Sequence, residues 1–135
     1  MRLNIDRIEA AAATINQVFL NTPQYVCESL SRALGCRIIL KVETLNPVRC
    51  FKGRGTEVVL ARLQSRGDTT SVVCASAGNL GQALAYGGRS RNFDVTVTAA
   101  AAANAVKVEK MRALAAKVVL SNSRSVFVRN HSRCA

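Results

Sequence analysis

Residues 71–88 read SVVCASAGNLGQALAYGG, and this stretch decides the fold class. SVVCA is short, apolar and rich in valine, which is typical of a buried strand. The small residues of SAGN predict a tight turn, and LGQALAYGG predicts a helix that ends at Gly87 and Gly88. A strand that leads through such a turn directly into a helix is typical of a βαβ unit.

The pattern repeats toward the C-terminus. FDVTVTA predicts a second strand, Asn104 can cap a helix that runs through AVKVEKMRALA, and KVVL predicts a third strand. Strands that alternate with helices indicate a parallel sheet. We therefore predict an α/β fold: an open, mostly parallel sheet with helices on both faces.

The signals toward the N-terminus are shorter. Apolar residues at helical spacing from Ile5 to Phe19 predict an amphipathic helix, which ends at the NTP of residues 21–23. SLSRALG predicts a short helix stopped by Gly35, and CRIILKVE predicts a strand over residues 37–42. Residues 51–66 again follow a helical pattern.

Composition limits the function classes. The 135 residues, 49% of them apolar, suffice for one domain, and no apolar run approaches the ~18 residues of a membrane span. Five cysteines without a CxxC pair indicate reduced thiols in a cytoplasmic protein. His131 and Cys134 are close in sequence, but two ligands do not complete a tetrahedral site, so we expect no metal.

The chain carries a formal net charge of +11, mostly from arginine. A nucleic-acid partner is the first explanation to consider for such a charge. The arginines are scattered, however, and they neither alternate with aromatic residues nor belong to a nucleic-acid-binding motif. The pattern indicates a solvated basic surface and disfavours a nucleic-acid partner.

The stretch NPVRCFKGRG, residues 46–55, places Lys52 between Phe51 and two glycines. This lysine can be one charge of a basic patch, part of a phosphate-binding loop, or a covalent tether for a cofactor. A Walker loop is disfavoured because its lysine follows the glycines. A helix N-terminus and an apolar neighbour favour the tether, because both disfavour the charged form of the amine. A plain surface lysine remains an equal alternative on this pattern alone, and Arg54 is predicted to form a structural ion pair.

The SAGN turn offers a second candidate site. Backbone N–H groups at the start of the following helix point outward and suit an anion such as a carboxylate. Ser76, Gly78 and Asn79 lie in this turn, and the side chain of Asn79 can add a hydrogen bond. The alternative is an ordinary strand–helix turn with a capping asparagine.

Together, the two stretches resemble the fold-type II pyridoxal-phosphate enzymes, and within them the threonine/serine dehydratase (threonine ammonia-lyase-like) group. The resemblance rests on NTP, LKVE, CFKGRG and SAGN, which occur in the family's order, and on KVEKMRALAAKVVL, which resembles the next family segment. It extends from about residue 5 to residue 120. Gly53 resembles the dehydratases, since threonine synthases and cysteine synthases usually carry aspartate after the lysine.

The resemblance implies a role for each matching residue. Lys52 matches the lysine that holds pyridoxal 5′-phosphate as a Schiff base and then moves the α-proton of the substrate. Phe51 matches the residue beside the cofactor ring, and Asn79 matches the asparagine that bonds its phenolic oxygen. Ser76, Gly78 and Asn79 match the loop that binds the substrate carboxylate. The implied reaction is elimination of water from L-threonine or L-serine, which yields a 2-oxo acid and ammonia.

Three positions depart from the family pattern. Cys50 replaces the usual serine beside Phe51, Leu80 stands where histidine is frequent, and Ala115 takes the place of a helix-ending glycine. A thiol is a weaker hydrogen-bond partner than a hydroxyl. If the backbone at Ala115 is left-handed, alanine there costs about 1 kcal/mol.

The resemblance also implies an organisation in which this chain is the N-terminal part of such an enzyme. Residues 1–45 match part of the family's large domain, residues 46–120 match the small domain that flanks the cofactor, and residues 121–135 form a divergent basic tail. The family's glycine-rich phosphate loop and the group facing the pyridine nitrogen come after the point where this chain stops. We therefore expect a mobile N-terminal region with exposed apolar surface.

Two alternatives to an active enzyme stay open. The first is an inactive fragment or degenerate relative that acts through a partner chain, which includes a homo-oligomer. The second, less favoured, is a basic nucleic-acid binder.

Overall fold

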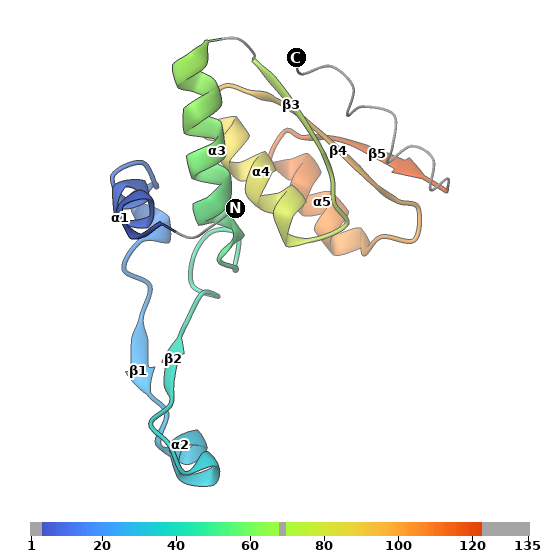
Figure 1. Cartoon of the computed structure of the whole chain (residues 1–135). Coiled ribbons are helices and arrows are strands. Elements are labelled where there is room, and N and C mark those ends of the chain that lie inside the picture. Colours follow the sequence, from blue (N-terminus) through green and yellow to red (C-terminus); the bar gives the residue numbers. More distant parts are fainter. Residues whose placement is uncertain (1–3, 68–69, 123–135) are drawn as a thin grey trace.

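The computed structural model describes residues 4–67 and 70–122 (Figure 1). The elements in chain order are α1 (Ile5–Ala12), the 3-10 turn η1 (Gln17–Phe19), β1 (Gln24–Val26), α2 (Glu28–Leu34), β2 (Ile39–Lys41), α3 (Lys52–Arg66), β3 (Ser71–Ala75), α4 (Asn79–Ser90), β4 (Asp94–Ala100), α5 (Ala105–Ala113) and β5 (Lys117–Ser121). No helix among the described residues has the length and apolar character needed to cross a membrane. Of the predicted basic tail, residues 121–135, the part from residue 123 onward, with His131 and Cys134, lies outside the described residues.

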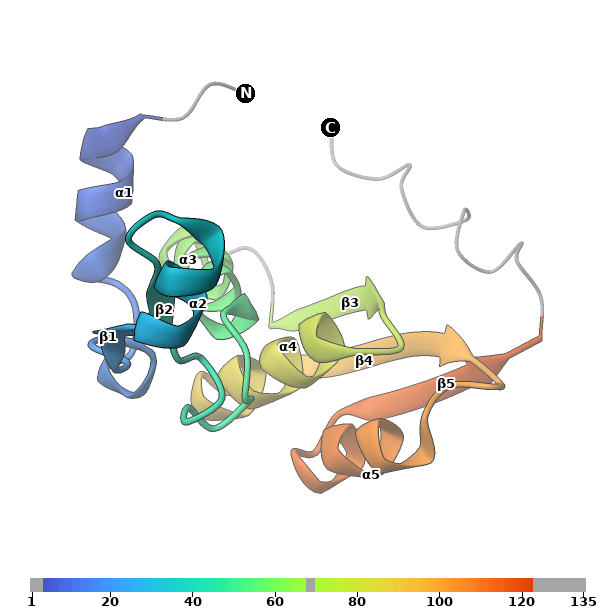
Figure 2. The same ribbon diagram turned by 90° about the horizontal axis from the view of Figure 1, so that it is seen from below.

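Strands β3, β4 and β5 form a parallel sheet in that order. Val72 pairs with Val95, and Val97 pairs with Val118. Because side chains alternate along a strand, these valines share one apolar face. Helices α4 and α5 both lie on this face (Figure 2). The predicted α/β class and parallel sheet are confirmed.

The opposite face of the sheet differs from the expectation of helices on both faces. In the described part of the chain it carries the half-buried Thr96 and Thr98, with the exposed Val73 and Val119 beside them. The physical reason lies in the connections. The connections β3–α4–β4 and β4–α5–β5 are successive right-handed crossovers. Because both move in the same direction across the sheet, they put both helices on the same side.

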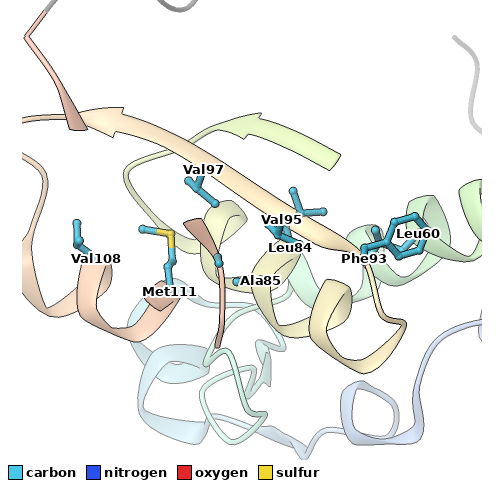
Figure 3. Packing of buried hydrophobic residues seen from close by; sticks show 9 residues of the cluster. Leu60, Leu84, Ala85, Phe93, Val95, Val97, Val108 and Met111 are labelled. Carbon is cyan, nitrogen blue, oxygen red and sulfur yellow. The ribbon is translucent and has the colours of Figure 1, made fainter. Parts of the chain in front are cut away.

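Buried apolar side chains of α3, α4 and α5 pack together with those of the sheet (Figure 3). Leu60, Ala85, Val97 and Met111 are fully buried in this cluster. Each large apolar side chain removed from water stabilises the fold by about 1.5 to 3 kcal/mol. The cluster therefore holds the loops at the ends of the strands in place.

Helix α4 does not end at Gly87 and Gly88, and the prediction of its end was wrong: it continues to Ser90. Both glycines face close neighbours. A Cβ atom at Gly87 would lie 2.8 Å from Cδ1 of Leu60, and one at Gly88 would lie 2.2 Å from Cγ2 of Val95. The glycines allow α4 to approach α3 and β4 closely, so they are packing positions inside the helix.

The N-terminal segment is anchored to the rest of the molecule by Phe19. The helix predicted over residues 5–19 is interrupted: α1 ends at Ala12, and η1 places Phe19 in a second buried cluster. The Phe19 ring meets the Tyr86 ring edge to face, with the centroids 5.5 Å apart. Gly53 makes room for it, because a Cβ there would lie 2.3 Å from the Phe19 ring.

Residues 23–42, here called the N-terminal arm, project away from the rest of the molecule (Figure 1). The arm consists of the antiparallel pair β1–β2 with α2 between them in sequence. The sequence prediction missed β1. Helix α2 ends at Gly35, whose φ of 67° confirms the predicted C-terminal glycine.

The N-terminal arm has no buried residue in β1, α2 or β2. Its apolar side chains Tyr25, Leu34 and Ile39 are each more than half exposed. The exposed apolar surface predicted for the N-terminal region is therefore confirmed, whereas its mobility stays a prediction.

Candidate active site

The loop that leads into α3 is shaped by the buried side chain of Asn46. Its Oδ1 accepts hydrogen bonds from the backbone N–H groups of Val48 (3.1 Å) and Cys50 (3.3 Å). Its Nδ2 donates to the carbonyl oxygens of Glu43 (2.8 Å) and Cys50 (3.0 Å). These bonds fix the backbone just before Lys52. The sequence prediction missed Asn46, although Asn-Pro is a turn signal that indicates such a role.

Lys52 is the first residue of α3, and its side chain is exposed. Its Nζ atom lies 4.8 Å from the centroid of the Phe51 ring. This amine makes no ion pair or hydrogen bond with the residues that the structure describes. Nζ is therefore available to a ligand, and Phe51 gives it an aromatic neighbour.

Arg54 forms the structural ion pair that the sequence predicts. Its Nη2 lies 2.8 Å from Oε1 of Glu43 and donates to Oγ1 of Thr22 at 3.0 Å. Its Nε donates to the carbonyl oxygen of Phe19 at 2.8 Å. Arg54 thus ties the first turn of α3 to the N-terminal segment, which helps to hold Lys52 in place.

A cavity of about 570 Å³ lies between α3, β3 and the start of α4. Its walls are mostly apolar and include Phe51, Val59, Val73 and Leu80. Among the described residues that line it, Lys52 is the only charged one. Cavities of roughly 300–1,000 Å³ suit small molecules. The helical pattern of residues 51–66 does not reveal that one side of α3, with Val59, borders a cavity.

Cys74 lines the same cavity from β3. Burial raises the pKa of its thiol, because desolvation disfavours the thiolate. The thiol stays neutral at neutral pH and adds to the apolar wall.

The SAGN turn follows β3 and opens α4. The hydroxyl oxygen of Ser76 accepts hydrogen bonds from the backbone N–H groups of Gly78 (3.2 Å) and Gly81 (3.0 Å). The N–H groups of Asn79 and Leu80 have no partner in the described part of the chain. This is expected for the first residues of a helix, whose amides have no carbonyl one turn back. Two such amides at the start of a helix suit a negatively charged group.

Asn79 contacts a residue that the sequence analysis missed. Nζ of Lys107, from the first turn of α5, lies 3.4 Å from Oδ1 of Asn79. A lysine in the first turn of a helix faces the positive end of its dipole. That unfavourable position is the sequence signal that marks Lys107 as unusual.

The structure brings part of the predicted site together. Lys52 and Phe51 share one cavity with Leu80 at the start of α4. Ser76, Gly78 and Asn79 lie next to Leu80 in sequence, but they are not among the residues that line the cavity. The SAGN loop and the amine of Lys52 therefore lie near each other, and the first turn of α4 connects the loop to the cavity.

The three departures from the family pattern have clear structural positions. Cys50 is a buried residue of the loop before α3, and its backbone is held by Asn46. Leu80 replaces a polar side chain with an apolar one at the cavity wall. Ala115 has a φ of 65°, so alanine does occupy a left-handed position there.

Comparison with known proteins identifies the family of the chain. The family model described as pyridoxal-phosphate dependent enzyme matches residues 15–134. The biosynthetic L-threonine dehydratase of Mycobacterium leprae is 40% identical over 83 residues, which are 62% of this chain and 19% of that protein. The chain thus spans about a fifth of the length of that relative.

Solved structures show the same similarity. A pyridoxal 5′-phosphate-dependent aspartate racemase matches with a TM-score of 0.79 at 28% identity, over 89% of this chain and 38% of that one. The threonine deaminase isoform 2 of Solanum lycopersicum matches with a TM-score of 0.70 at 27% identity, over 88% of this chain and 36% of that one. The chain belongs to the family of pyridoxal-phosphate-dependent enzymes.

Proposed function

We propose that this chain provides the tether lysine and the substrate loop of a pyridoxal-phosphate-dependent lyase of the threonine/serine dehydratase type. The observation that carries the proposal is the position of Lys52, whose amine has no partner in the described residues and borders a mostly apolar cavity. The relatives named as threonine dehydratases support the reaction type. Because the chain spans about a fifth of the first of these, the activity of the whole enzyme is part of the proposal.

The residues of the site fit the cofactor. An aldehyde requires an accessible primary amine, and Nζ of Lys52 is one. An aromatic ring requires apolar walls, which the cavity of about 570 Å³ offers, with Phe51 beside the amine. A negatively charged group requires donors without competing partners, and the amides of Asn79 and Leu80 meet this need.

Lys52 has two tasks in this proposal. Its Nζ atom would hold the cofactor through the aldehyde carbon, with the aldehyde oxygen leaving as water. Once the amino group of the substrate has replaced it there, the freed Nζ would take and hold the proton from Cα of the substrate. When bound, the cofactor supplies the electron sink for the pair of electrons left on Cα. Phe51 packs beside the ring and keeps water away from one side of the amine.

The SAGN loop has the task of binding and orienting the substrate. The backbone N–H groups of Asn79 and Leu80 donate to the substrate carboxylate. Ser76 and Gly78 set the position of these amides, because the Ser76 hydroxyl accepts the N–H groups of Gly78 and Gly81. The side chain of Asn79 bonds the phenolic oxygen of the cofactor.

The net reaction removes the β-hydroxyl and the α-proton of L-threonine or L-serine as water. A second water then replaces the amino nitrogen, which leaves as ammonia together with a 2-oxo acid. The substrate is thus a small hydroxy amino acid. The free thiols of the described cysteines are consistent with a reducing, cytoplasmic location.

The test is to add pyridoxal 5′-phosphate to the full chain, reduce the adduct with borohydride, and map the modified lysine by mass spectrometry. We expect the label on Lys52, together with a visible absorbance band before reduction. Lys52→Ala should lose both. Lys110→Ala, which removes an exposed lysine from α5, is the matched control and should keep both.

Labelling spread over surface lysines, and unchanged in Lys52→Ala, would overturn the tether. A chain that carries the label on Lys52 is then given L-threonine or L-serine, and the 2-oxo acid is trapped with a hydrazine. Racemisation is the competing reaction, and it is identified by D-amino acid in place of a 2-oxo acid.

A second candidate is an inactive relative that acts through a partner chain. The exposed apolar side chains of the N-terminal arm favour it, because such surface marks contact sites. Light scattering over a range of concentrations tests this candidate: a mass that grows with concentration supports it, and a constant monomer mass contradicts it.

A further inference from the structure

The contact between α5 and the SAGN loop follows from the sheet topology. The loop leaves the carboxyl end of β3, and α5 begins beyond the carboxyl end of β4, the neighbouring parallel strand. Such loops meet at one edge of a sheet, which is where α/β proteins bind ligands. Lys107 reaches across this edge: its Nζ lies 3.4 Å from Oδ1 of Asn79 and 3.8 Å from the position of a Cβ at Gly78.

Lys107 occupies a position that α5 itself disfavours. Asn104 caps the helix, and its Oδ1 accepts the backbone N–H of Lys107 at 3.2 Å. The third residue after this cap lies at the positive end of the helix dipole, where a cation is unfavourable. Among the described residues, Nζ of Lys107 has no carboxylate partner. It donates a hydrogen bond to Oδ1 of Asn79 instead.

An ammonium group decides which way the Asn79 amide points. The ammonium has three donors and no acceptor, so it can bond only the oxygen of an amide. If the amide were reversed, its NH₂ group would face another donor. Lys107 therefore holds Oδ1 on its own side and leaves Nδ2 of Asn79 facing away from α5.

We propose that Lys107 is a positioning residue that fixes the Asn79 amide so that Nδ2 is the group offered to the cofactor's phenolic oxygen. The inference rests on the proposed function. A phenolate oxygen accepts hydrogen bonds, so Asn79 serves it only through Nδ2. Lys107 thus acts through Asn79 and touches neither cofactor nor substrate.

The first test needs no cofactor. The side-chain NH₂ resonances of Asn79 are assigned in a nitrogen–proton correlation spectrum of the full chain by their loss in Asn79→Ala. We expect Lys107→Met to move these resonances, and Lys107→Arg to move them less because it keeps a cationic donor. Lys110→Met, which removes a charge one turn further along α5, should leave them in place. Unmoved resonances in a folded Lys107→Met protein would overturn the contact.

The second test measures the affinity for pyridoxal 5′-phosphate from the absorbance of the adduct. Lys107→Met and Asn79→Ala should each weaken it by about three- to tenfold, the effect of one lost hydrogen bond. The double variant should be no weaker than Asn79→Ala, because Lys107 acts only through that amide. Losses that multiply in the double variant would overturn the positioning role.

The two proposals fail in different ways. If the wild-type chain carries no cofactor on Lys52, the proposed function is overturned, and with it the role of Lys107 toward the cofactor. The Asn79 resonances still decide whether Lys107 orients the amide. If Lys52 is labelled and Lys107→Met does not change the affinity for pyridoxal 5′-phosphate, only the positioning role is overturned.

Discussion

Two regions of the molecule are built in opposite ways. One is the sheet region, which consists of α3, α4, α5 and the parallel sheet, and the other is the N-terminal arm. In the first, seven of the twelve residues of α4 are buried, and even a Cβ at Gly88 finds no room. In the second, α2 has no buried residue, and Leu34 is 64% exposed. The first region makes its own core, whereas the apolar side chains of the arm find none among the described residues.

Residues on either side of the arm attach it to the first turn of α3 at two anchors. Phe19 is buried against the first turn of α3, and Arg54 pairs with Glu43. The same turn carries Lys52, so attachment of the N-terminal segment and presentation of the amine are coupled. Stability should therefore depend on the sheet region, while the anchors should matter for the geometry of the site.

The largest expected difference is between equal truncations in the two regions. Leu60→Ala removes a fully buried side chain and should lower the free energy of unfolding by about 3 kcal/mol. Leu34→Ala removes an exposed side chain of the arm and should change it by less than about 0.5 kcal/mol. Urea unfolding followed by circular dichroism measures both, and equal losses would contradict the comparison.

Two buried or partly buried ion pairs provide the next contrast. Arg91 bonds Oε2 of Glu57 at 2.9 Å, and Glu57 is almost fully buried, with Oε1 unpartnered among the described residues. Arg91→Met leaves that carboxylate uncompensated and should lower the global stability by about 3 kcal/mol.

Arg54→Met is the matched change at the anchor. Its partner Glu43 retains some contact with water, so the loss should be local. Amide exchange should accelerate over residues 19–43 while that of β4 stays slow. Acceleration of β4 by Arg54→Met would show that the two regions unfold as one.

Two helix glycines test close packing at a smaller scale. Gly88→Ala places a Cβ 2.2 Å from Val95 and should destabilise the chain by about 2 kcal/mol. Gly55→Ala, in α3, meets nothing within 4 Å and should stabilise it by up to about 1 kcal/mol through helix propensity. Thermal melting measures both shifts, and a shift of the same sign would argue against the packing role of Gly88.

The smallest effect concerns the thiols. Burial raises the pKa of Cys74, so its neutral form stabilises the fold; this contribution is lost above about pH 8.5, where an unfolded cysteine loses its proton. At pH 8 we expect iodoacetamide to modify the exposed Cys36 of the arm well before Cys74. Mass spectrometry of timed samples gives the order, and faster reaction of Cys74 would refute its burial.

The sequence allowed much of the sheet region to be predicted, because its signals are local. Valine-rich strands, the SAGN turn and the Asn104 cap define β3, α4, β4 and α5 without knowledge of their partners. The prediction of the C-terminal end of α4 was wrong because that end depends on contacts with distant residues. Gly87 and Gly88 are helix stops by propensity, but contacts with Leu60 and Val95 require glycine inside the helix.

The candidate site likewise has a part that the sequence predicts and a part that depends on tertiary contacts. The sequence alone was enough to predict Lys52, Phe51 and the loop of Ser76, Gly78 and Asn79 as site residues, because their types and order carry the family pattern. The cavity beside Lys52, the role of Asn46 and the reach of Lys107 to Asn79 depended on residues distant along the chain. Tertiary structure alone decided them, because a contact across two parallel strands leaves no periodic pattern in the sequence.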